Sequence, residues 1–149
     1  MKRVSLILLL LGITASIIAQ NVPQEVYSKV FNPAFSKNYA KTSVIITGEF
    51  FSPKAPTYVV YPTKLKNYVK FQCVDVGEQG KSDQLSGEAK GEVFCIDKSK
   101  SDIIFSLKKG DLVKITGKTY TVSYSGNFSF DSVYFIVSNI EKIDDAIEK

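Results

Sequence analysis

The stretch LKKGDLVKITGK, residues Leu107–Lys118, is the most informative segment for the fold. Gly110 and Asp111 within it predict a turn, because glycine and aspartate are frequent where the chain reverses. The residues Asp111–Thr121 predict a β-strand that begins at this turn. The compact apolar cluster Ile103–Leu107 just before it suits one helical or 3₁₀ turn. The stretch therefore predicts a helix-like connection that leads into a strand.

Four further segments predict strands because they are rich in β-branched and aromatic residues. They are Ser43–Phe51, Tyr68–Val76, Glu92–Asp97 and Ser132–Ile140. Gly48, inside the first of them, predicts a bulge or bend. Five short strands with a helix-like link between the third and the fourth are the layout of an all-β, five-stranded Greek-key barrel, the OB-fold. The alternatives are an immunoglobulin-like sandwich, which needs about seven strands, and an open meander.

The chain divides into three parts. Residues 1–19 predict a cleaved signal peptide, residues 20–42 a short N-terminal helix with a lead-in segment, and residues 43–149 the OB-fold domain. The helix is expected over Asn21–Phe31, with Asn21 as its cap and Asn32–Pro33 at its end. The tail from Ile140 to Lys149 has isoleucines at helical spacing and predicts a helical turn or two.

The N-terminus has the three regions of a secretory signal. Lys2 and Arg3 precede an apolar stretch from Val4 to Ala19, and the preferred cleavage follows Ala19. The alternative is an uncleaved membrane anchor, but a spanning helix needs about 20 apolar residues and this run is interrupted by small polar ones. No later stretch is apolar enough to span a membrane. We therefore expect an exported protein, located in the periplasm, at the cell surface or outside the cell.

Composition argues against most enzymes. The chain contains no histidine, the commonest general base and metal ligand. Its only arginine is Arg3, so the exported part lacks the residue preferred for bidentate phosphate and guanine contacts. No nucleophile elbow, phosphate-binding loop, dinucleotide fingerprint or metal-ligand spacing occurs. We expect no catalytic residues, no metal, no cofactor and no nucleic-acid reading.

Three segments resemble exported bacterial OB-fold proteins related to the tRNA anticodon-binding domain. They are Ser36–Gly48, Val93–Cys95 and Phe105–Lys118, whose most specific part is the pattern L-x-K-G-D-x-V-x-I-x-G-K. The resemblance spans about residues 36–143 and implies the OB-fold. Its motifs are structural, and members of this broad group bind nucleic acids, sugars or peptides, so it does not transfer a function.

The two cysteines, Cys73 and Cys95, predict a disulfide, because an even count in an exported chain favours one. If the second and third strands pair across a loop centred near residue 84, the two cysteines lie opposite each other and can be bridged. The alternative is two small buried thiols.

The OB-fold binds ligands on the face of its second and third strands, flanked by the loops after the first and fourth. Lysines and rings gather there, with no acid between Ser52 and Lys70. The predicted ligand-binding residues are Lys54, Tyr58, Tyr61, Lys64, Lys66, Lys70, Phe71 and Tyr120. Cations interleaved with aromatic rings suit a single-stranded nucleic acid or a glycan. The alternative is that the tyrosines pack the loop against the barrel while the lysines keep it soluble.

These features predict a non-enzymatic exported binding module for an envelope ligand, a glycan or another polyanion. The competing hypothesis is a structural or assembly protein that docks on another envelope protein. Single-stranded nucleic-acid binding ranks below both, because an exported chain rarely meets nucleic acid. The run Asp97–Asp102 superficially suggests a calcium loop but lacks the required glycine and glutamate, so a solvated turn is expected.

Overall fold

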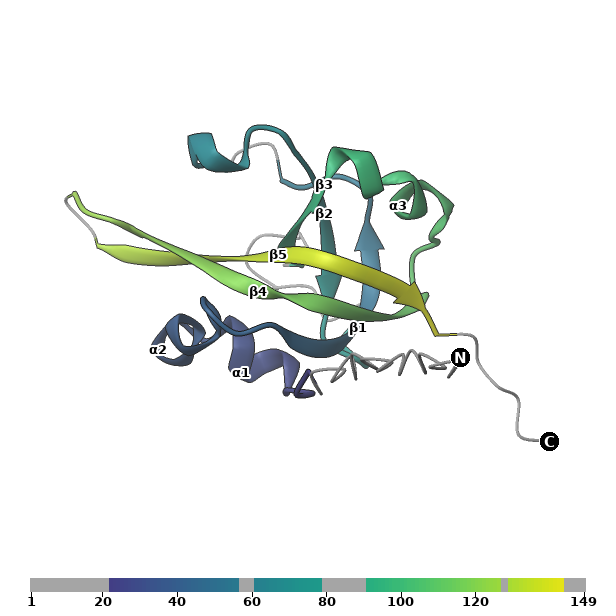
Figure 1. The fold of residues 1–149 in the computed structure, drawn as a ribbon, viewed down its shortest axis with the longest axis horizontal. Helices are drawn as coiled ribbons and strands as arrows, with labels where there is room; N and C mark the ends of the chain where they lie inside the picture. The colour runs from purple at the N-terminus through teal and green to yellow at the C-terminus, as the bar shows by residue number, and fades with distance from the viewer. Residues whose placement is uncertain (1–21, 57–60, 79–90, 127–128, 144–149) are drawn as a thin grey trace, which may run out of the picture.

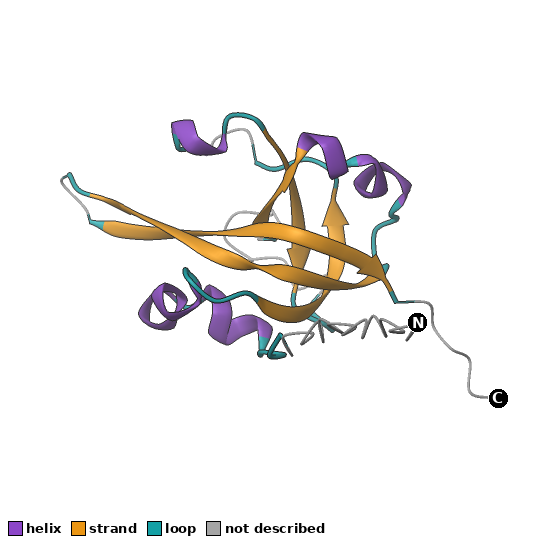
Figure 2. Ribbon diagram, viewed as in Figure 1, coloured by secondary structure: helices purple, strands orange, loops and turns teal. Residues whose placement is uncertain are grey.

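The structure, a computed structural model, describes residues 22–56, 61–78, 91–126 and 129–143. Five strands form one closed barrel in the order β1-β2-β3-β5-β4 (Figures 1 and 2). They are β1 Val44–Ser52, β2 Tyr68–Val74, β3 Glu92–Asp97, β4 Leu112–Tyr124 and β5 Phe130–Lys142. The β3–β5 pair is parallel and the other pairs are antiparallel. The prediction of a five-stranded, mostly β architecture is confirmed.

Six short helical elements connect or cover these strands. They are α1 Tyr27–Phe31, α2 Pro33–Ser36, η1 Lys37–Tyr39, η2 Thr63–Leu65, η3 Lys98–Lys100 and α3 Asp102–Ser106. The link expected between the third and fourth strands is present as η3 and α3. Ile104 of α3 is fully buried in the barrel core, so this link closes one end of the barrel.

The N-terminal helix is shorter than predicted. Glu25 donates its backbone N–H to the carbonyl of Ile45 at 2.8 Å, and Ile45 donates to Pro23 at 2.8 Å. These residues therefore run extended along β1, and α1 begins only at Tyr27. Asn32 ends α1 as expected and then caps α2, because its side-chain oxygen accepts from the Ala34 N–H at 2.9 Å. Asn21 lies outside the described residues.

The strands differ from the prediction mainly at β4 and β5. Each runs for 13 residues, longer than expected, and together they form a hairpin that projects beyond the barrel (Figure 1). β5 continues to Lys142, so the first part of the predicted C-terminal helix is wrong, and residues 144–149 lie outside the described part. β2 ends at Val74, two residues early.

The bulge predicted at Gly48 lies elsewhere. Gly48 pairs regularly with Val113, whereas the register shifts fall between Phe50 and Ser52 and between Thr116 and Gly117. A Cβ at Gly117 would overlap the carbonyl oxygen of Ile136 and lie 2.6 Å from the Phe135 ring. Only glycine lets β4 approach β5 this closely. The register shift lies at this position, where the long hairpin bends away from the barrel.

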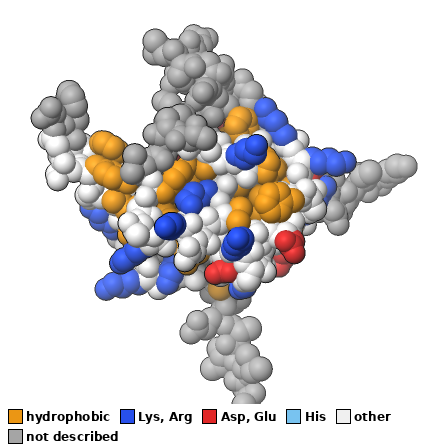
Figure 3. All heavy atoms as spheres, turned by 90° about the horizontal axis from the view of Figure 1, so that it is seen from above, with side chains coloured by type: hydrophobic (Ala, Val, Ile, Leu, Met, Phe, Trp, Pro, Cys, Tyr) orange, Lys and Arg blue, Asp and Glu red, His pale blue; other side chains and the backbone are white. Residues whose placement is uncertain are grey.

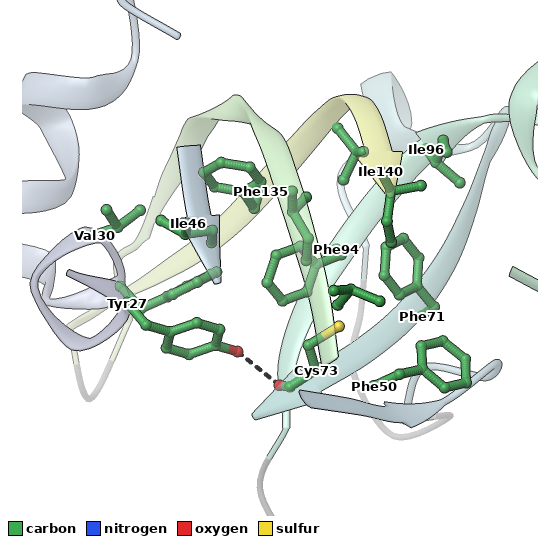
Figure 4. Packing of buried hydrophobic residues seen from close by; sticks show 14 of the residues in the cluster. Tyr27, Val30, Ile46, Phe50, Phe71, Cys73, Phe94, Ile96, Phe135 and Ile140 are labelled. Atoms are coloured by element: carbon green, nitrogen blue, oxygen red, sulfur yellow. Dashed lines mark hydrogen bonds between the residues drawn. The ribbon is translucent and has the colours of Figure 1, made fainter. Parts of the chain in front are cut away.

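The barrel core is aromatic and includes the N-terminal helix. Phe50, Phe71, Phe94 and Phe135 are fully buried, and in this order each ring packs against the next (Figure 4). Tyr27 of α1 packs against Phe94, with ring centroids 6.1 Å apart. The helix thus packs into the barrel core and is part of the domain.

The predicted disulfide between Cys73 and Cys95 is wrong, and both cysteines are free thiols. The observed register pairs Cys73 with Glu92 and Lys70 with Cys95, three residues away from the expected alignment. Residues on two paired strands that are an odd number of positions out of register point to opposite faces of the sheet. Cys73 accordingly lies in the barrel core, and Cys95 lies in a separate cluster outside it.

No described helix is long and apolar enough to cross a membrane. The predicted signal peptide, residues 1–19, lies outside the described part of the chain.

Candidate functional site

The outward side of β2, β3 and β5 carries a second apolar cluster, separate from the barrel core. Its buried members are Leu65, Val93, Cys95 and Tyr134. Partly buried side chains surround them, namely Ala55, Tyr61, Tyr68, Tyr120, Val122 and Ile136. We call this side of the sheet the outer face. It is the face on which the sequence predicts the ligand site.

The chain covers part of this face with its own β1–β2 connection. Leu65, in η2, is only 3% exposed because it packs onto the outer face. Tyr61 also packs onto the outer face, since its ring centroid lies 6.0 Å from that of Tyr134. Its hydroxyl donates to the Pro56 carbonyl at 3.0 Å. We call residues 61–67 the cover segment. Tyr61 therefore packs the loop against the barrel, the alternative role stated for the tyrosines.

Lys70 joins the cover segment to β2. Its Nζ lies 5.1 Å from the centre of the Tyr61 ring and donates to the Tyr68 carbonyl at 3.1 Å. A cation over a tyrosine face is electrostatically favourable. Cys95 lies across the strand pair from Lys70, and burial raises the pKa of its thiol to about 12, an effect that the lysine charge reduces. Lys70 thus stabilises the cover segment, and it is half-buried.

The remaining predicted lysines are exposed. Lys64 and Lys66 lie on either side of the buried Leu65, and Lys54 follows β1. The 3₁₀ turn of η2 fixes this alternation through the bonds Leu65 N–H to Pro62 carbonyl, 2.8 Å, and Lys66 N–H to Thr63 carbonyl, 3.1 Å. No described residue between 61 and 74 is acidic. The cover segment therefore holds cations outward on an apolar base.

The three remaining predicted site residues are aromatic, and the two that the structure describes are not exposed as the lysines are. Phe71 is fully buried among Phe50 and Phe94 in the barrel core, so its prediction as a ligand contact is wrong. The physical reason is strand alternation: Lys70 faces outward, so its neighbour Phe71 faces inward. Tyr120 is half-buried at the edge of the outer cluster. Tyr58 lies outside the described residues.

The projecting hairpin carries an aromatic pair that is not among the predicted ligand-binding residues. Tyr124 and Phe130 lie opposite each other on β4 and β5, with ring centroids 5.0 Å apart and an angle of 21° between the rings. Phe130 is 58% exposed. The signal was the four-residue spacing of Tyr120 and Tyr124, and of Phe130 and Tyr134, which places each pair on one face of a strand. The outer face thus extends from the cover segment to the hairpin tip.

Burial affects two ionisable groups on this part of the sheet, one on the outer face and one at the start of β3. The Tyr134 hydroxyl is buried and has no hydrogen-bond partner within the described part of the chain, and burial raises its pKa. Glu92, at the start of β3, lines a hollow of about 370 Å³ together with Phe31 and Asp131. Burial raises the Glu92 pKa to about 7. Within the described residues no group of three potential metal ligands occurs.

The Asp97–Asp102 run forms a capped turn. The Asp97 carboxylate accepts from the Ser99 N–H at 2.8 Å and from the Ser99 hydroxyl at 2.6 Å, which begins η3. These bonds hold the Asp97 pKa below its usual value.

No family model matches the chain, and no curated protein matches it. A solved structure of a putative aspartyl-tRNA synthetase from Leishmania major Friedlin aligns with 91% of the chain, at 10% identity and a TM-score of 0.51. The chain spans 23% of that protein. This alignment and the strand order decide the fold. The barrel is an OB-fold.

Two other OB-fold structures align less closely. The mitochondrial single-stranded DNA binding protein Rim1 from S. cerevisiae aligns at 11% identity and a TM-score of 0.47, over 68% of this chain and 94% of its own. The S. pombe Stn1-Ten1 complex aligns at 17% identity and a TM-score of 0.40, over 69% and 59%. An OB-fold supports many different functions.

Proposed function

We propose that this chain is an exported, non-enzymatic OB-fold binding module for an extended anionic ligand of the cell envelope, a glycan or another polyanion. The ligand lies along the uncovered part of the outer face. The cover segment forms one side of this surface and the β4–β5 hairpin the other. Lys54, Lys64 and Lys66 supply the charge, and the rings of Tyr120, Tyr124 and Phe130 supply the apolar contacts.

The observation that carries this proposal is the anchoring of Leu65. Lysines in long surface loops ordinarily lose much side-chain and backbone entropy when a ligand orders them. Here the buried Leu65 and the η2 turn already fix the backbone that carries Lys64 and Lys66. Because no acid of residues 61–74 neutralises them, these cations remain available to a ligand.

Sequence features support the remaining parts of the proposal. The N-terminal charged and apolar stretch supports export. The absence of histidine from the whole chain supports a binding role over acid–base or metal catalysis.

A binding panel with charge variants tests the proposal. The probes are an anionic polysaccharide, polyphosphate and a single-stranded oligonucleotide, each measured at low and at physiological salt. We expect one of the first two to bind with an affinity that falls as salt rises. Lys64→Glu/Lys66→Glu should weaken binding about tenfold or more, and Lys41→Glu/Lys114→Glu, which makes the same change of net charge at exposed positions elsewhere, should leave it within about twofold.

Leu65→Ala separates anchoring from charge, because it keeps both lysines but removes the side chain that fixes them. It should lower affinity several-fold. The absence of binding to every probe at low salt, or equal effects of the two double charge variants, would contradict the proposal. Preference for the oligonucleotide would indicate single-stranded nucleic-acid binding instead.

One observation favours the alternative of an assembly protein. Phe130 and Tyr124 stack at the exposed end of a hairpin that projects from the barrel. Exposed aromatic side chains are typical centres of protein–protein contacts. Salt-insensitive capture of one envelope protein, lost on Phe130→Ser and retained on Lys64→Glu/Lys66→Glu, would establish this second function.

A further inference from the structure

The link between β3 and β4 presents a basic surface that the proposed ligand site does not use. We call residues 98–109, with η3 and α3, the α3 cap. Its four lysines, Lys98, Lys100, Lys108 and Lys109, are all exposed. Between them in the sequence lies Phe105, which is 68% exposed, the largest exposed fraction among the large apolar side chains of the described residues. An exposed apolar ring thus lies in a segment that carries four exposed cations.

The α3 cap is firmly seated, so the exposure of Phe105 is not caused by a loose segment. Ile104 is fully buried, and Ile103 and Leu107 pack against the barrel core. Lys100 donates to the Ser138 carbonyl at 3.5 Å, and the Lys109 ammonium lies 4.6 Å from the centre of the Phe51 ring. A helix of five residues with its apolar side buried leaves Phe105 directed to solvent.

Acidic groups near the cap are few, and two of them are engaged. The Asp97 carboxylate caps η3 through Ser99. Asp111 accepts from the Lys108 backbone N–H at 2.8 Å and forms an ion pair with Lys142 at 3.1 Å. Asp102 is the one acid within the cap itself. Four lysines against one aspartate leave the cap positively charged.

The same end of the barrel also carries η2. Tyr68 pairs with Asp97, so the segment before β2 and the segment after β3 emerge side by side. Figure 3 looks onto this end of the molecule and shows lysine side chains spread among apolar ones, with acidic side chains mainly along one edge. A hollow of about 240 Å³ lies between the cap and β5, lined by Lys100, Ile103 and Ser138 among others, and Phe105 is not among its lining residues.

From this arrangement we infer that the α3 cap docks on an anionic phospholipid surface. The inference is independent of the proposed ligand site. Cations near an anionic bilayer are attracted to its negative surface potential, and an exposed ring among them enters the interface between headgroups and acyl chains. Phe105 inserts, and the four lysines contact headgroup phosphates.

Phe105→Trp tests insertion directly. The chain contains no tryptophan, so this variant has a single indole at the proposed contact, and it is excited at wavelengths that the tyrosines do not absorb. The protein is used in the processed form that cells accumulate, identified by mass spectrometry, so that the N-terminus is identical in all variants. We expect the emission to shift to shorter wavelength with phosphatidylcholine vesicles that contain phosphatidylglycerol, and not with phosphatidylcholine alone. An unchanged emission with both vesicles overturns the inference.

Charge variants test the lysines by vesicle sedimentation. Lys98→Glu/Lys108→Glu should lower the partition coefficient on the anionic vesicles about tenfold or more, whereas Lys41→Glu/Lys114→Glu should change it by less than about threefold. Phe105→Ser should lower it several-fold without a change of charge. Equal losses in both double variants, or a loss only with Lys64→Glu/Lys66→Glu, would overturn the inference. The last result would show that headgroups occupy the ligand site. Circular dichroism confirms that each variant is folded.

Discussion

The Tyr27 hydroxyl donates a hydrogen bond of 2.7 Å to the backbone carbonyl of Cys73, 46 residues along the chain (Figure 4). This buried bond joins α1 to β2, and the Tyr27 ring also contacts Phe31 and Phe94. Burial raises the Tyr27 pKa well above its usual value, so the hydroxyl remains a donor. The segment before the barrel is therefore part of the folded domain.

Tyr27→Phe should destabilise the protein by about 1–2 kcal/mol, because the buried Cys73 carbonyl loses its partner while the ring packing is kept. Urea unfolding monitored by circular dichroism measures the difference. Tyr68→Phe is a suitable control, since Tyr68 is half-buried and its hydroxyl has no hydrogen bond with the described residues. An equal effect of both substitutions would mean that the Tyr27 bond contributes nothing.

Gly117→Ala should be one of the most damaging single substitutions in the chain. Its Cβ would collide with the Ile136 carbonyl and the Phe135 ring, in the centre of the β4–β5 crossing. We expect a loss of about 3 kcal/mol or more, or no folded protein, from overpacking against backbone. Gly126→Ala, where a Cβ meets nothing within 4 Å, should change the unfolding midpoint little. A well-folded, wild-type-like Gly117→Ala protein would contradict the tight crossing.

The two thiols should remain unbonded even after export into an oxidising compartment. Cys73 and Cys95 lie on opposite faces of the β2–β3 pair, and burial raises the pKa of each thiol. Thiolate is the reactive form, so a thiol reagent should label the native protein slowly and the urea-unfolded protein rapidly at two sites. Intact mass without reductant reports the bond directly. A mass lower by two hydrogens would show that the disulfide forms.

Stability should depend on the ionisation of Glu92. Burial raises the pKa of this carboxyl from 4.5 to about 7, so the folded state binds the proton more tightly than the unfolded state. The corresponding stability is fully present below about pH 4.5 and is lost as the pH rises through about 7. Glu92→Gln cannot ionise, so its stability relative to wild type should increase by roughly 2–3 kcal/mol between pH 4.5 and pH 8.

The exposed Glu141 provides the control for this measurement. Glu141→Gln is measured over the same range, to give the effect of removing a carboxyl at an exposed position. If the Glu92→Gln difference varies no more with pH than the Glu141→Gln difference, the carboxyl is ionised normally in the folded protein.

The residue pattern alone was sufficient to predict the general architecture. Val113 and Ile115 alternate with polar residues after the Gly110–Asp111 turn, and this local pattern predicts a strand because alternate side chains point to opposite faces. The compact apolar cluster Ile103–Leu107 predicts the helical link, which is also a local property of the sequence. The extended contact of Pro23–Glu25 with Ile45 depends on residues distant in the sequence, so helical spacing over 21–31 predicted too long a helix.

The candidate site was predictable only in part. Charge is visible in the residues, so the sequence predicts Lys54, Lys64 and Lys66 as ligand contacts, and the structure shows that all three are exposed. Burial depends on which face of a strand a side chain occupies. A prediction with the wrong register or the wrong face therefore assigns the side chain to the wrong surroundings. For this reason the sequence pattern wrongly predicts a ligand contact at Phe71, which is buried, and a bond between Cys73 and Cys95, which do not pair.

For this chain the sequence by itself determined the order of the strands along the chain, the helical link, the absence of histidine and the basic β1–β2 connection. The tertiary structure alone decided that Leu65 folds this connection onto the outer face, that the thiols lie apart, and that Phe105 stands exposed among lysines. The reason is that periodicity and charge are local properties. Register and burial arise only when segments distant in the sequence are brought together.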